Sequence, residues 1–414
     1  MSIARTRPER PRRPTGEFSD LRRGTNQAGG RLYNERLVLS LVRKNGALPK
    51  AEIARQTGLS PQTISTIANS LERDGLLVRQ TPQKGRVGQP SVPYALAADG
   101  ALAFGMKIGR RSADLMLVDL LGTVRGKLRT TYPYPNPQEI LAFMERGLAA
   151  LAGTLTLEQR DRIVGIGIAL PFELWNWGKQ VGAPAEVLEA WRTLDIGQEI
   201  ESRARMPVYV YNDATAACAA ELLLGNPSNY LDFLYIFIGS FIGGGVVLNG
   251  SLFPGRSGYA GAIAPLPIRR DDGEYEQVLN YASLFVLAER MQEKGLDPDV
   301  LWHERGGWQM IGDLLEGWVE ELCDSLALIV MSATAIIDFE AVIIDGGFPD
   351  PVRRQIVEKV RRRLETFDRQ GLSRVDVIAG ELGPDARAMG GACIPLLSQF
   401  TLDREVLFKD ESSN

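Results

Sequence analysis

Residues 50–75 have the sequence KAEIARQTGLSPQTISTIANSLERDG, which predicts two short helices joined by a tight turn. The first helix is expected to end at Gly58, since glycine commonly follows the last turn of a helix. Ser60 is expected to cap the second helix, with Pro61 as its first residue, and apolar residues recur at helical spacing to about Asp74. One face of the second helix is therefore predicted to be buried and the other exposed.

The residues on either side extend this pair of helices into a small domain. An earlier helix is expected over residues 31–45. Two short β-strands over residues 76–80 and 92–96 flank a loop that contains glycine and proline, residues 81–90. Three helices followed by a hairpin are typical of a winged helix-turn-helix. The sequence predicts such a domain over residues 31–97.

The exposed face of the second helix carries short polar side chains that can hydrogen-bond to base edges in a DNA major groove. The hairpin loop adds two cations between glycines, which suit a narrow minor groove. A solvated polar surface without a partner is the alternative interpretation. The residues predicted to contact DNA are Ser60, Gln62, Thr63, Ser65, Thr66, Asn69, Lys84 and Arg86.

Charge is distributed unevenly along the 414 residues, whose net charge is −4. Residues 1–90 contain 17 basic and 7 acidic residues, whereas the other 324 residues contain 30 basic and 44 acidic ones. A basic segment on an acidic body favours binding of that segment to a polyanion. Residues 1–30 are rich in Arg, Pro and Gly and poor in apolar residues, so we expect a disordered basic arm there.

Other features exclude several classes of protein. The longest strongly apolar stretch, residues 326–337, is shorter than the roughly 20 residues that span a bilayer. Three cysteines without Cys-x-x-Cys spacing and a single histidine predict neither a disulfide framework nor a zinc site. The N-terminus lacks the apolar segment of a secretory signal. We therefore expect a cytoplasmic protein with no membrane partner.

After residue 100 the chain alternates between apolar, β-rich segments and helical stretches, which is the pattern of an α/β fold. One set of segments occupies residues 101–225 and a second set occupies residues 226–382. We expect two α/β lobes with a cleft between them. A C-terminal helix over residues 383–402 is expected to return to the first lobe.

Five motifs, most of them rich in glycine, occur in order along this body. They are residues 210–217 followed by Glu221, residues 238–245 followed by Asn249-Gly250, residues 255–261, residues 337–347 and residues 383–392. In this order, behind a winged helix, they resemble the motifs of the ROK family (repressors, open reading frames, kinases) of the actin-like sugar-kinase superfamily. The resemblance covers roughly residues 31–402. It implies a winged helix-turn-helix followed by a two-lobed actin-like ATPase fold of the ROK sugar-kinase type.

The chain departs from the kinases of that family at the positions that would hold ATP phosphates and magnesium. Family kinases open with an Asp-x-Gly-Gly-Thr loop, where this chain has Lys107 in place of the carboxylate and Arg111 in place of the threonine. Phe241 replaces a small residue in the second phosphate loop, and Asp345 adds negative charge on the nucleotide side. Phosphoryl transfer depends on positioning and on metal-assisted charge neutralisation. The resemblance therefore implies a degenerate kinase that needs no ATP.

The family's zinc site is also absent from the sequence. Ala262 and Pro265 stand where the family signature has glutamate and histidine, and residues 269–276 replace its cysteine cluster. Without thiolates or an imidazole, a tetrahedral zinc site is not expected. Glu274 or Glu276 could substitute for the carboxylate lost at 262.

The pair Asn212 and Asp213 is retained, and the resemblance implies that these residues bind the hydroxyl groups of a sugar. The same pair can also cap the helix that follows. We expect Pro171, Glu173 and Asn176, on the loop after the strand 163–169, to reach the ligand as well.

The sequence thus predicts a transcriptional regulator that represses genes of sugar uptake or catabolism. Its expected partners are double-stranded operator DNA and a small effector, a sugar or sugar derivative, that binds between the lobes. A homodimer or homotetramer is expected, because an operator with two half-sites requires two DNA-binding domains. Two alternatives are an ATP-dependent hexose or N-acetylhexosamine kinase, and an architectural protein with a vestigial cleft.

Overall fold

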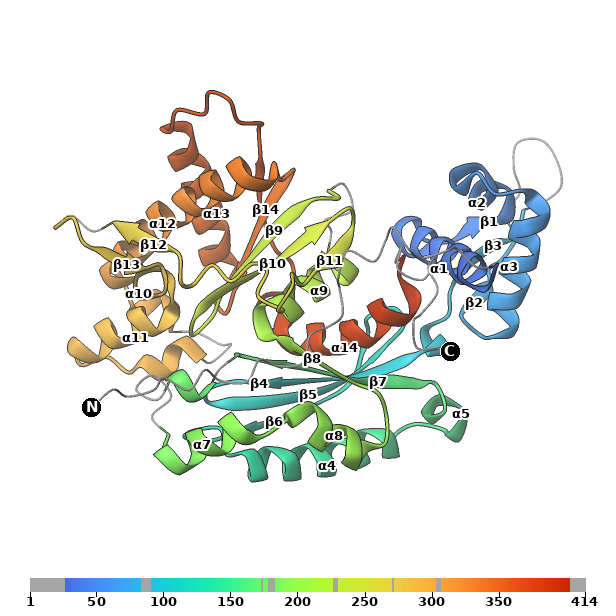
Figure 1. Ribbon diagram of the computed structural model, residues 1–414, viewed down its shortest axis with the longest axis horizontal. Helices are drawn as coiled ribbons and strands as arrows, with labels where there is room; N and C mark the ends of the chain where they lie inside the picture. Colours follow the sequence, from blue (N-terminus) through green and yellow to red (C-terminus); the bar gives the residue numbers. More distant parts are fainter. Residues whose placement is uncertain are drawn as a thin grey trace, which may run out of the picture.

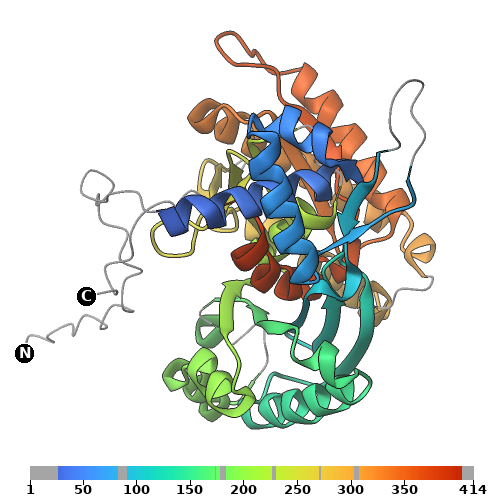
Figure 2. The same ribbon diagram turned by 90° about the vertical axis from the view of Figure 1, so that its right-hand side faces the viewer.

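A computed structural model describes residues 27–82, 91–172, 174–177, 183–225, 230–269, 272–302 and 307–402. It consists of an N-terminal head and two α/β lobes that lie one above the other in Figure 1, with the head at one end of both lobes. Figure 2 looks at the molecule from the head side. The arrangement confirms the predicted fold class.

The head has the predicted order of helices and strands. Its elements are α1 (Gln27–Asn45), β1 (Leu48–Pro49), α2 (Lys50–Thr57), α3 (Pro61–Arg73), β2 (Leu77–Arg79) and β3 (Pro93–Leu96), with sheet order β1-β3-β2. Gly58 ends α2 with a left-handed φ of 70°, as its position in the sequence predicts. The Ser60 side chain accepts a hydrogen bond from the Thr63 amide and so caps α3.

One boundary differs from the sequence prediction. Helix α1 begins at Gln27, four residues before the expected start at Arg31, so residues 27–30 are helical instead of part of a disordered arm. Once a helix is anchored by its apolar face, each added residue gains a backbone hydrogen bond without any further apolar contact. Residues 1–26 lie outside the described residues.

The two lobes have sheets of the same plan. In the first lobe the strand order is β6-β5-β4-β7-β8, and in the second it is β11-β10-β9-β14-β15. Each sheet has three antiparallel strands that are consecutive in the chain, followed by two parallel strands. The strands are β4 (Leu102–Ile108), β5 (Ser112–Asp119), β6 (Val124–Thr131), β7 (Ile163–Leu170), β8 (Val208–Asn212), β9 (Phe233–Ile238), β10 (Ile242–Leu248), β11 (Ser251–Phe253), β14 (Ala341–Gly346) and β15 (Asp376–Ala379).

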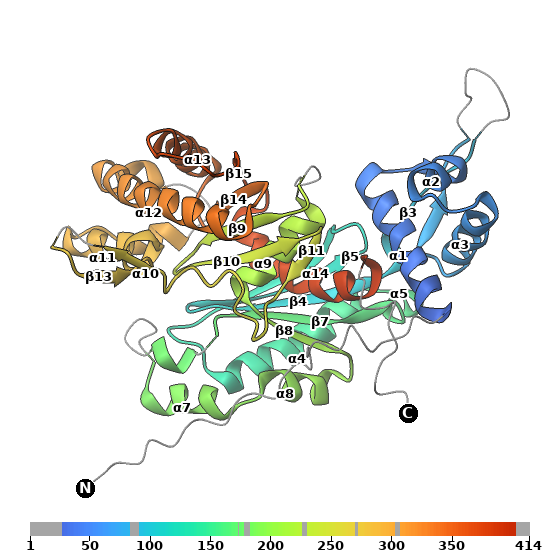
Figure 3. The ribbon, with the colours of Figure 1, turned by 45° about the horizontal axis from the view of Figure 1, so that its top comes forward.

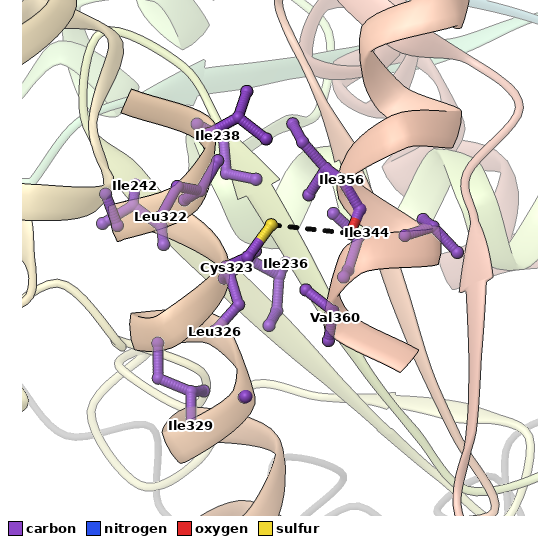
Figure 4. Close-up of a cluster of buried hydrophobic side chains, with 14 of the residues drawn as sticks. Ile236, Ile238, Ile242, Leu322, Cys323, Leu326, Ile329, Ile344, Ile356 and Val360 are labelled. Carbon is purple, nitrogen blue, oxygen red and sulfur yellow. Dashed lines mark hydrogen bonds between the residues drawn. The ribbon is translucent and has the colours of Figure 1, made fainter. Parts of the chain in front are cut away.

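Helices cover the outer face of each sheet. The first sheet is covered by α4 (Pro137–Gly153), α7 (Ala185–Thr193) and α8 (Ile196–Ala204), and the second by α10 (Leu279–Ala282), α11 (Leu284–Glu293), α12 (Asp313–Ile337) and α13 (Asp350–Glu365). Figure 4 shows the core of the second lobe, where isoleucines of the sheet meet apolar side chains of α12 and α13. Cys323 donates a weak hydrogen bond to the Ile356 carbonyl there. A small hairpin of β12 (Pro267–Arg269) and β13 (Tyr275–Gln277) and the short α5 (Leu157–Arg160) complete the lobes.

Two helices, α9 (Asp213–Leu224) and α14 (Ala386–Phe400), lie between the sheets (Figures 1 and 3). Helix α14 packs on the inner face of the first sheet, where a side chain at Gly105 or Gly167 would collide with its backbone. Helix α9 packs on the second sheet through apolar contacts with β9. The two helices contact each other at Gly390, where an added Cβ would lie 1.8 Å from the Ala216 carbonyl oxygen. Small residues therefore allow both helices to pack closely.

All three cysteines, Cys218, Cys323 and Cys393, are buried and unpaired. Within the described part of the chain, no helix is both long enough and apolar enough to cross a bilayer.

Candidate functional site

The outer surface of α3 carries the residues predicted to read DNA. Ile64 and Ile67 are buried in the head as predicted. Gln62, Thr66 and Asn69 are exposed, whereas Thr63 and Ser65 are half-buried. The helix therefore presents a polar face to solvent, with its centre formed by the three exposed residues.

Several of these side chains are already engaged within the head. Ser60 Oγ lies 2.8 Å from Thr63 Oγ1, and the Thr66 hydroxyl donates to the Gln62 carbonyl. Lys50 Nζ donates to Asn69 Oδ1 at 2.8 Å and to Ser65 Oγ at 3.3 Å. The helical periodicity of α3 gives no sign of Lys50, because this lysine comes from the start of α2.

Gln62 is thus the exposed polar side chain of α3 that makes no hydrogen bond to the described residues. Lys50 adds a positive charge to the same face of α3, at Ser65 and Asn69, and also lies 5.2 Å from the centre of the Tyr94 ring. Lys84 and Arg86 of the hairpin loop lie outside the described residues. The candidate interface therefore centres on Gln62, with Lys50 at its edge.

A second candidate site is a pocket of about 580 Å³ between the lobes, called here the inner pocket. Of the predicted ligand residues, Asn212, Asp213 and Pro171 line it. Glu173 lies outside the described residues, as does the side chain of Asn176. Polar groups of the lining that the sequence did not predict come from seven different helices, strands and connections. They are Arg110, Thr215, Ser240, Tyr259, Gln277, Asn280 and Arg387.

Asn212 and Asp213 occupy this position because strand β8 ends there and α9 begins. Asn212 Oδ1 accepts a hydrogen bond from the Ala214 amide at 3.0 Å, which caps α9. Asp213 Oδ2 lies 3.1 Å from Arg387 Nη1 in an ion pair, with both side chains largely buried. Asn212 therefore caps α9 and lines the inner pocket at the same time.

Arg387 comes from the first turn of α14 and is 174 residues away from Asp213 in the sequence. Its guanidinium also lies 4.9 Å from the centre of the Phe237 ring, on β9. It forms part of the motif at residues 383–392, but nothing within that motif indicates which side chain it meets. The pairing depends on how α14 docks between the lobes.

Apart from Asp213, the described residues that line the inner pocket include no acidic group. Ala262 and Pro265 line it at the positions where the ROK signature has glutamate and histidine. Glu276 does not replace the lost carboxylate, since its two oxygens accept hydrogen bonds from Asn280 and Tyr281. Within the described residues, no group of three or more His, Cys, Asp or Glu side chains is arranged to hold a metal ion.

A larger pocket of about 970 Å³, called here the outer pocket, lies next to the inner one. Lys107 and Arg111 both line it. Lys107 is 8% exposed, and its Nζ lies 3.1 Å from Asp114 Oδ2 and 3.0 Å from Ser112 Oγ. Burial, reinforced by the charge of Arg387, lowers the pKa of Lys107 to about 8.

Two residues of this nucleotide side make contacts that the sequence does not indicate. Phe241 packs edge-to-face on Phe285 and lines the inner pocket. Asp345 is fully buried and accepts hydrogen bonds from Arg353, Tyr235 and the Gly383 amide, so its charge is compensated within the second lobe. Neither effect can be deduced from sequence spacing, because each depends on contacts between distant elements.

The glycines of the motif 238–245 also have a different role from the predicted one. Gly243 and Gly245 lie in β10, where an added Cβ would be 2.8 Å from Ala214 Cβ and 2.4 Å from Cys218 Cβ. These glycines let α9 approach the second sheet. Only the turn before them, at Gly239 and Ser240, borders the outer pocket.

Two family models match this chain. The model described as the ROK family matches residues 103–276, and the model described as the MarR family matches residues 31–86. The second match coincides with the head, and the first extends from β4 to the hairpin of the second lobe. Both agree with the domain order predicted from the sequence.

Individual proteins show the same relationship. The chain is 25% identical over 378 residues to the protein y4fQ of Sinorhizobium fredii. This alignment covers 89% of this chain and 91% of that protein. It is also 24% identical over 239 residues to the xylose repressor of Bacillus subtilis, and this alignment covers 57% of this chain and 60% of the repressor. A solved ROK family transcriptional regulator, a homologue of the Escherichia coli MLC protein, superposes with a TM-score of 0.61 at 20% identity. That superposition covers 90% of this chain and 97% of the other, and it supports the fold.

Proposed function

We propose that this chain, which carries a ROK family domain behind a MarR-type winged helix, is a sugar-responsive DNA-binding repressor of sugar uptake or catabolism genes. Its similarity to the xylose repressor supports both the DNA partner and a sugar as effector. The alignment spans 60% of that repressor, so the activity of the whole protein is part of the proposal. A regulator of this kind needs a physical connection between its ligand pocket and its DNA-binding head.

The observation that carries the proposal is that α9 and α14 both connect the inner pocket to the head. Asp213 and Arg387, in their first turns, line that pocket. Toward their other ends, Leu223 and Leu396 belong to an apolar cluster that contains side chains of α1 and of the first lobe and so joins the head to that lobe. The contact is reinforced by Ser40 of α1, which accepts a hydrogen bond from a backbone amide just after α14.

The packing of these helices suggests how a ligand would change DNA affinity. Helix α9 packs on the second sheet and α14 on the first, so a change in the angle between the lobes displaces one helix relative to the other. Because both helices contribute to the apolar cluster that joins the head to the first lobe, the head would be displaced too. A ligand that favours one angle would thus alter the spacing of two heads in a dimer or tetramer, and with it the fit to paired half-sites.

We also propose that the ROK domain is catalytically inactive and binds neither ATP nor zinc for its function. The ion pair with Arg387 ties the Asp213 carboxylate, which would otherwise accept a proton from a sugar hydroxyl. Lys107 places a cation where a kinase needs an acid to face magnesium. Ala262 and Pro265 cannot act as zinc ligands.

DNA binding is tested with the full-length protein on genomic fragments at one fixed salt concentration, because electrostatic binding is strongly dependent on salt. We expect a few sites with a shared palindrome, and loss of that binding in the presence of one class of sugar or sugar derivative. Diffuse binding that salt removes, without a common motif, would contradict the proposal and support an architectural role.

The kinase alternative has one observation in its favour, namely an intact Asp213 beside an open outer pocket. It is tested by coupled ATP turnover with hexoses and N-acetylhexosamines in excess magnesium. We expect no turnover above background, and none in the variant Lys107→Asp. Turnover that depends on one sugar would overturn the proposal of an inactive domain.

A further inference from the structure

The inner and outer pockets meet at a junction lined by residues that belong to both. These are Gly109, Arg110, Ser240 and Arg387. The junction lies where the β4–β5 turn, the β9–β10 turn and the start of α14 come together. A ligand in the inner pocket that extends toward the outer one must pass the two arginines.

Positive charge exceeds negative charge around this junction. Lys107 and Arg129 share the carboxylate of Asp114, and Arg387 is paired with Asp213. Arg110 makes no ion pair with the described residues, although Glu289 contributes a favourable charge from the second lobe. Of the other described carboxylates that line the outer pocket, Asp350 pairs with Arg353 and Asp385 with Lys127, whereas Asp299 and Glu381 form no ion pair with the described residues. The excess of positive charge is therefore confined to the four junction residues, which include two arginines and no acid.

Both arginines of the junction have unused hydrogen-bonding capacity. The Nε atoms of Arg110 and Arg387 are buried and have no hydrogen-bond partner among the described residues. A buried donor without a partner costs about 1–3 kcal/mol, and more when it is charged. Burial, followed by the nearby charge of Arg111, lowers the pKa of Arg110. An anion bound at the junction would offset the cost of burying these two guanidinium charges.

We propose that the effector carries a carboxylate or phosphate, which Arg110 and Arg387 bind at the junction while the hydroxyl-bearing body of the ligand occupies the inner pocket. This inference rests on the proposed function and specifies the chemical class of its effector. The hydroxyl groups would meet Asn212 and Asn280, which are neutral polar groups of the lining. No metal ion is needed, because the arginines supply the charge that magnesium supplies in a kinase site.

The buried Lys107 supports the same assignment. Its ammonium faces Asp114 and Ser112 on one side and the cations Arg129 and Arg387 on the other. Since the pKa of Lys107 is lowered to about 8, an anion at the junction would raise this pKa again. Anion binding near pH 8 should therefore be accompanied by proton uptake by the protein.

The experiment compares matched sugars by titration calorimetry on the full-length protein, without magnesium and at constant ionic strength. One set consists of glucose, glucuronate and glucose 6-phosphate, and the other of N-acetylglucosamine and its 6-phosphate. We expect binding by acids or phosphates and at least tenfold weaker binding by the neutral sugars. Comparing glucuronate with glucose 6-phosphate shows whether the site prefers a carboxylate or a phosphate. Inorganic phosphate alone shows whether the sugar part of the ligand is needed for binding.

Two variants make the test specific. We expect Arg110→Gln to weaken binding of the anionic ligand by a factor of ten or more, since a hydrogen bond to a charged group contributes about 1.5–3 kcal/mol. Arg146→Gln, at an exposed arginine on α4, is the matched control and should bind like the parent protein. Equal binding by Arg110→Gln and the parent would overturn the inference.

The remaining outcomes separate this inference from the proposed function. If neutral sugars bind the protein and dissociate it from DNA while their charged counterparts do not, the proposed regulatory function stands and the anion site is overturned. If charged ligands bind but DNA affinity is unchanged, the anion site stands and the regulatory function fails. Binding of ATP alone, or of no compound in either set, would overturn the anion site.

Discussion

Asp213 and Arg387 form an ion pair across the first turns of α9 and α14, with Arg387 Nη1 at 3.1 Å from Asp213 Oδ2. The pair stands at the pocket end of two helices whose other ends contribute to the apolar cluster that joins the DNA-binding head to the first lobe. It therefore joins the ligand site to the elements that position the head. The two partners belong to helices that pack mainly on different sheets, α9 on the second and α14 on the first.

Substitution Asp213→Asn should weaken effector binding by at least tenfold. Titration calorimetry measures this effect, with the compound that binds the parent protein most tightly among the two sets of sugars named above. The amide keeps the size of the side chain but removes the charge that orders Arg387 and accepts ligand hydroxyls. Asp161→Asn, at an exposed position after α5, is the control. Unchanged affinity in Asp213→Asn would show that the carboxylate does not clamp the ligand.

Substitution Gly390→Ala should destabilise the protein by about 1–3 kcal/mol or more, since the new methyl group collides with backbone atoms of α9. It should also change the response of DNA affinity to the effector, because it alters the spacing between the two connecting helices. Gly317→Ala on α12 is the control, as nothing lies within 4 Å of its added Cβ. There we expect equal or slightly greater stability. Thermal unfolding and DNA titration measure the two effects, and parent-like behaviour of Gly390→Ala in both would contradict this role of the helix contact.

Substitution Gln62→Ala should weaken binding to the specific DNA site by about 1–3 kcal/mol while leaving non-specific binding nearly unchanged. Gln62 is exposed on α3 and makes no side-chain hydrogen bond to the described residues, so it is available to a base edge. Gln292→Ala, at an exposed position on α11, serves as control. Fluorescence anisotropy with specific and scrambled duplexes measures the difference. An equal loss on both duplexes would exclude Gln62 from sequence readout.

Substitution Glu221→Gln should remove a pH dependence of stability between about pH 4.5 and 7. Burial, reinforced by the charge of Asp345, raises the pKa of Glu221 to about 7. Between these values the folded protein holds a proton that the unfolded chain releases, so stability falls as the pH rises. The pKa difference corresponds to on the order of 3 kcal/mol.

Thermal unfolding from pH 4 to 8 tests this expectation. The melting temperature of Glu221→Gln relative to the parent should increase as the pH rises to about 7 and then remain constant. Glu158→Gln, at an exposed glutamate on α5, should show no such trend. Parallel pH curves for Glu221→Gln and the parent would contradict the raised pKa.

Several parts of the fold were predictable because their determinants are local. The stop at Gly58, the cap at Ser60 and the apolar face with Ile64 and Ile67 depend on spacings of a few residues, and each is present in the structure. The order of motifs likewise indicated the two-lobed body. The start of α1 was misjudged because residues 27–30 carry no apolar pattern.

The candidate site was predicted only in part. Asn212 and Asp213 were identified because they directly follow a strand and begin a helix. Arg110 and Arg387 were not, since sequence spacing does not reveal which distant elements meet at a pocket.

The sequence by itself determined the head and the α/β body, because short-range spacing and residue type encode them. Only the tertiary structure decided which charges face one another. Asp213 is compensated by Arg387, Asp345 by Arg353, and Lys50 engages the surface of α3. These pairings depend on how sheets and helices dock, and docking is set by the summed packing of residues that are far apart in the chain.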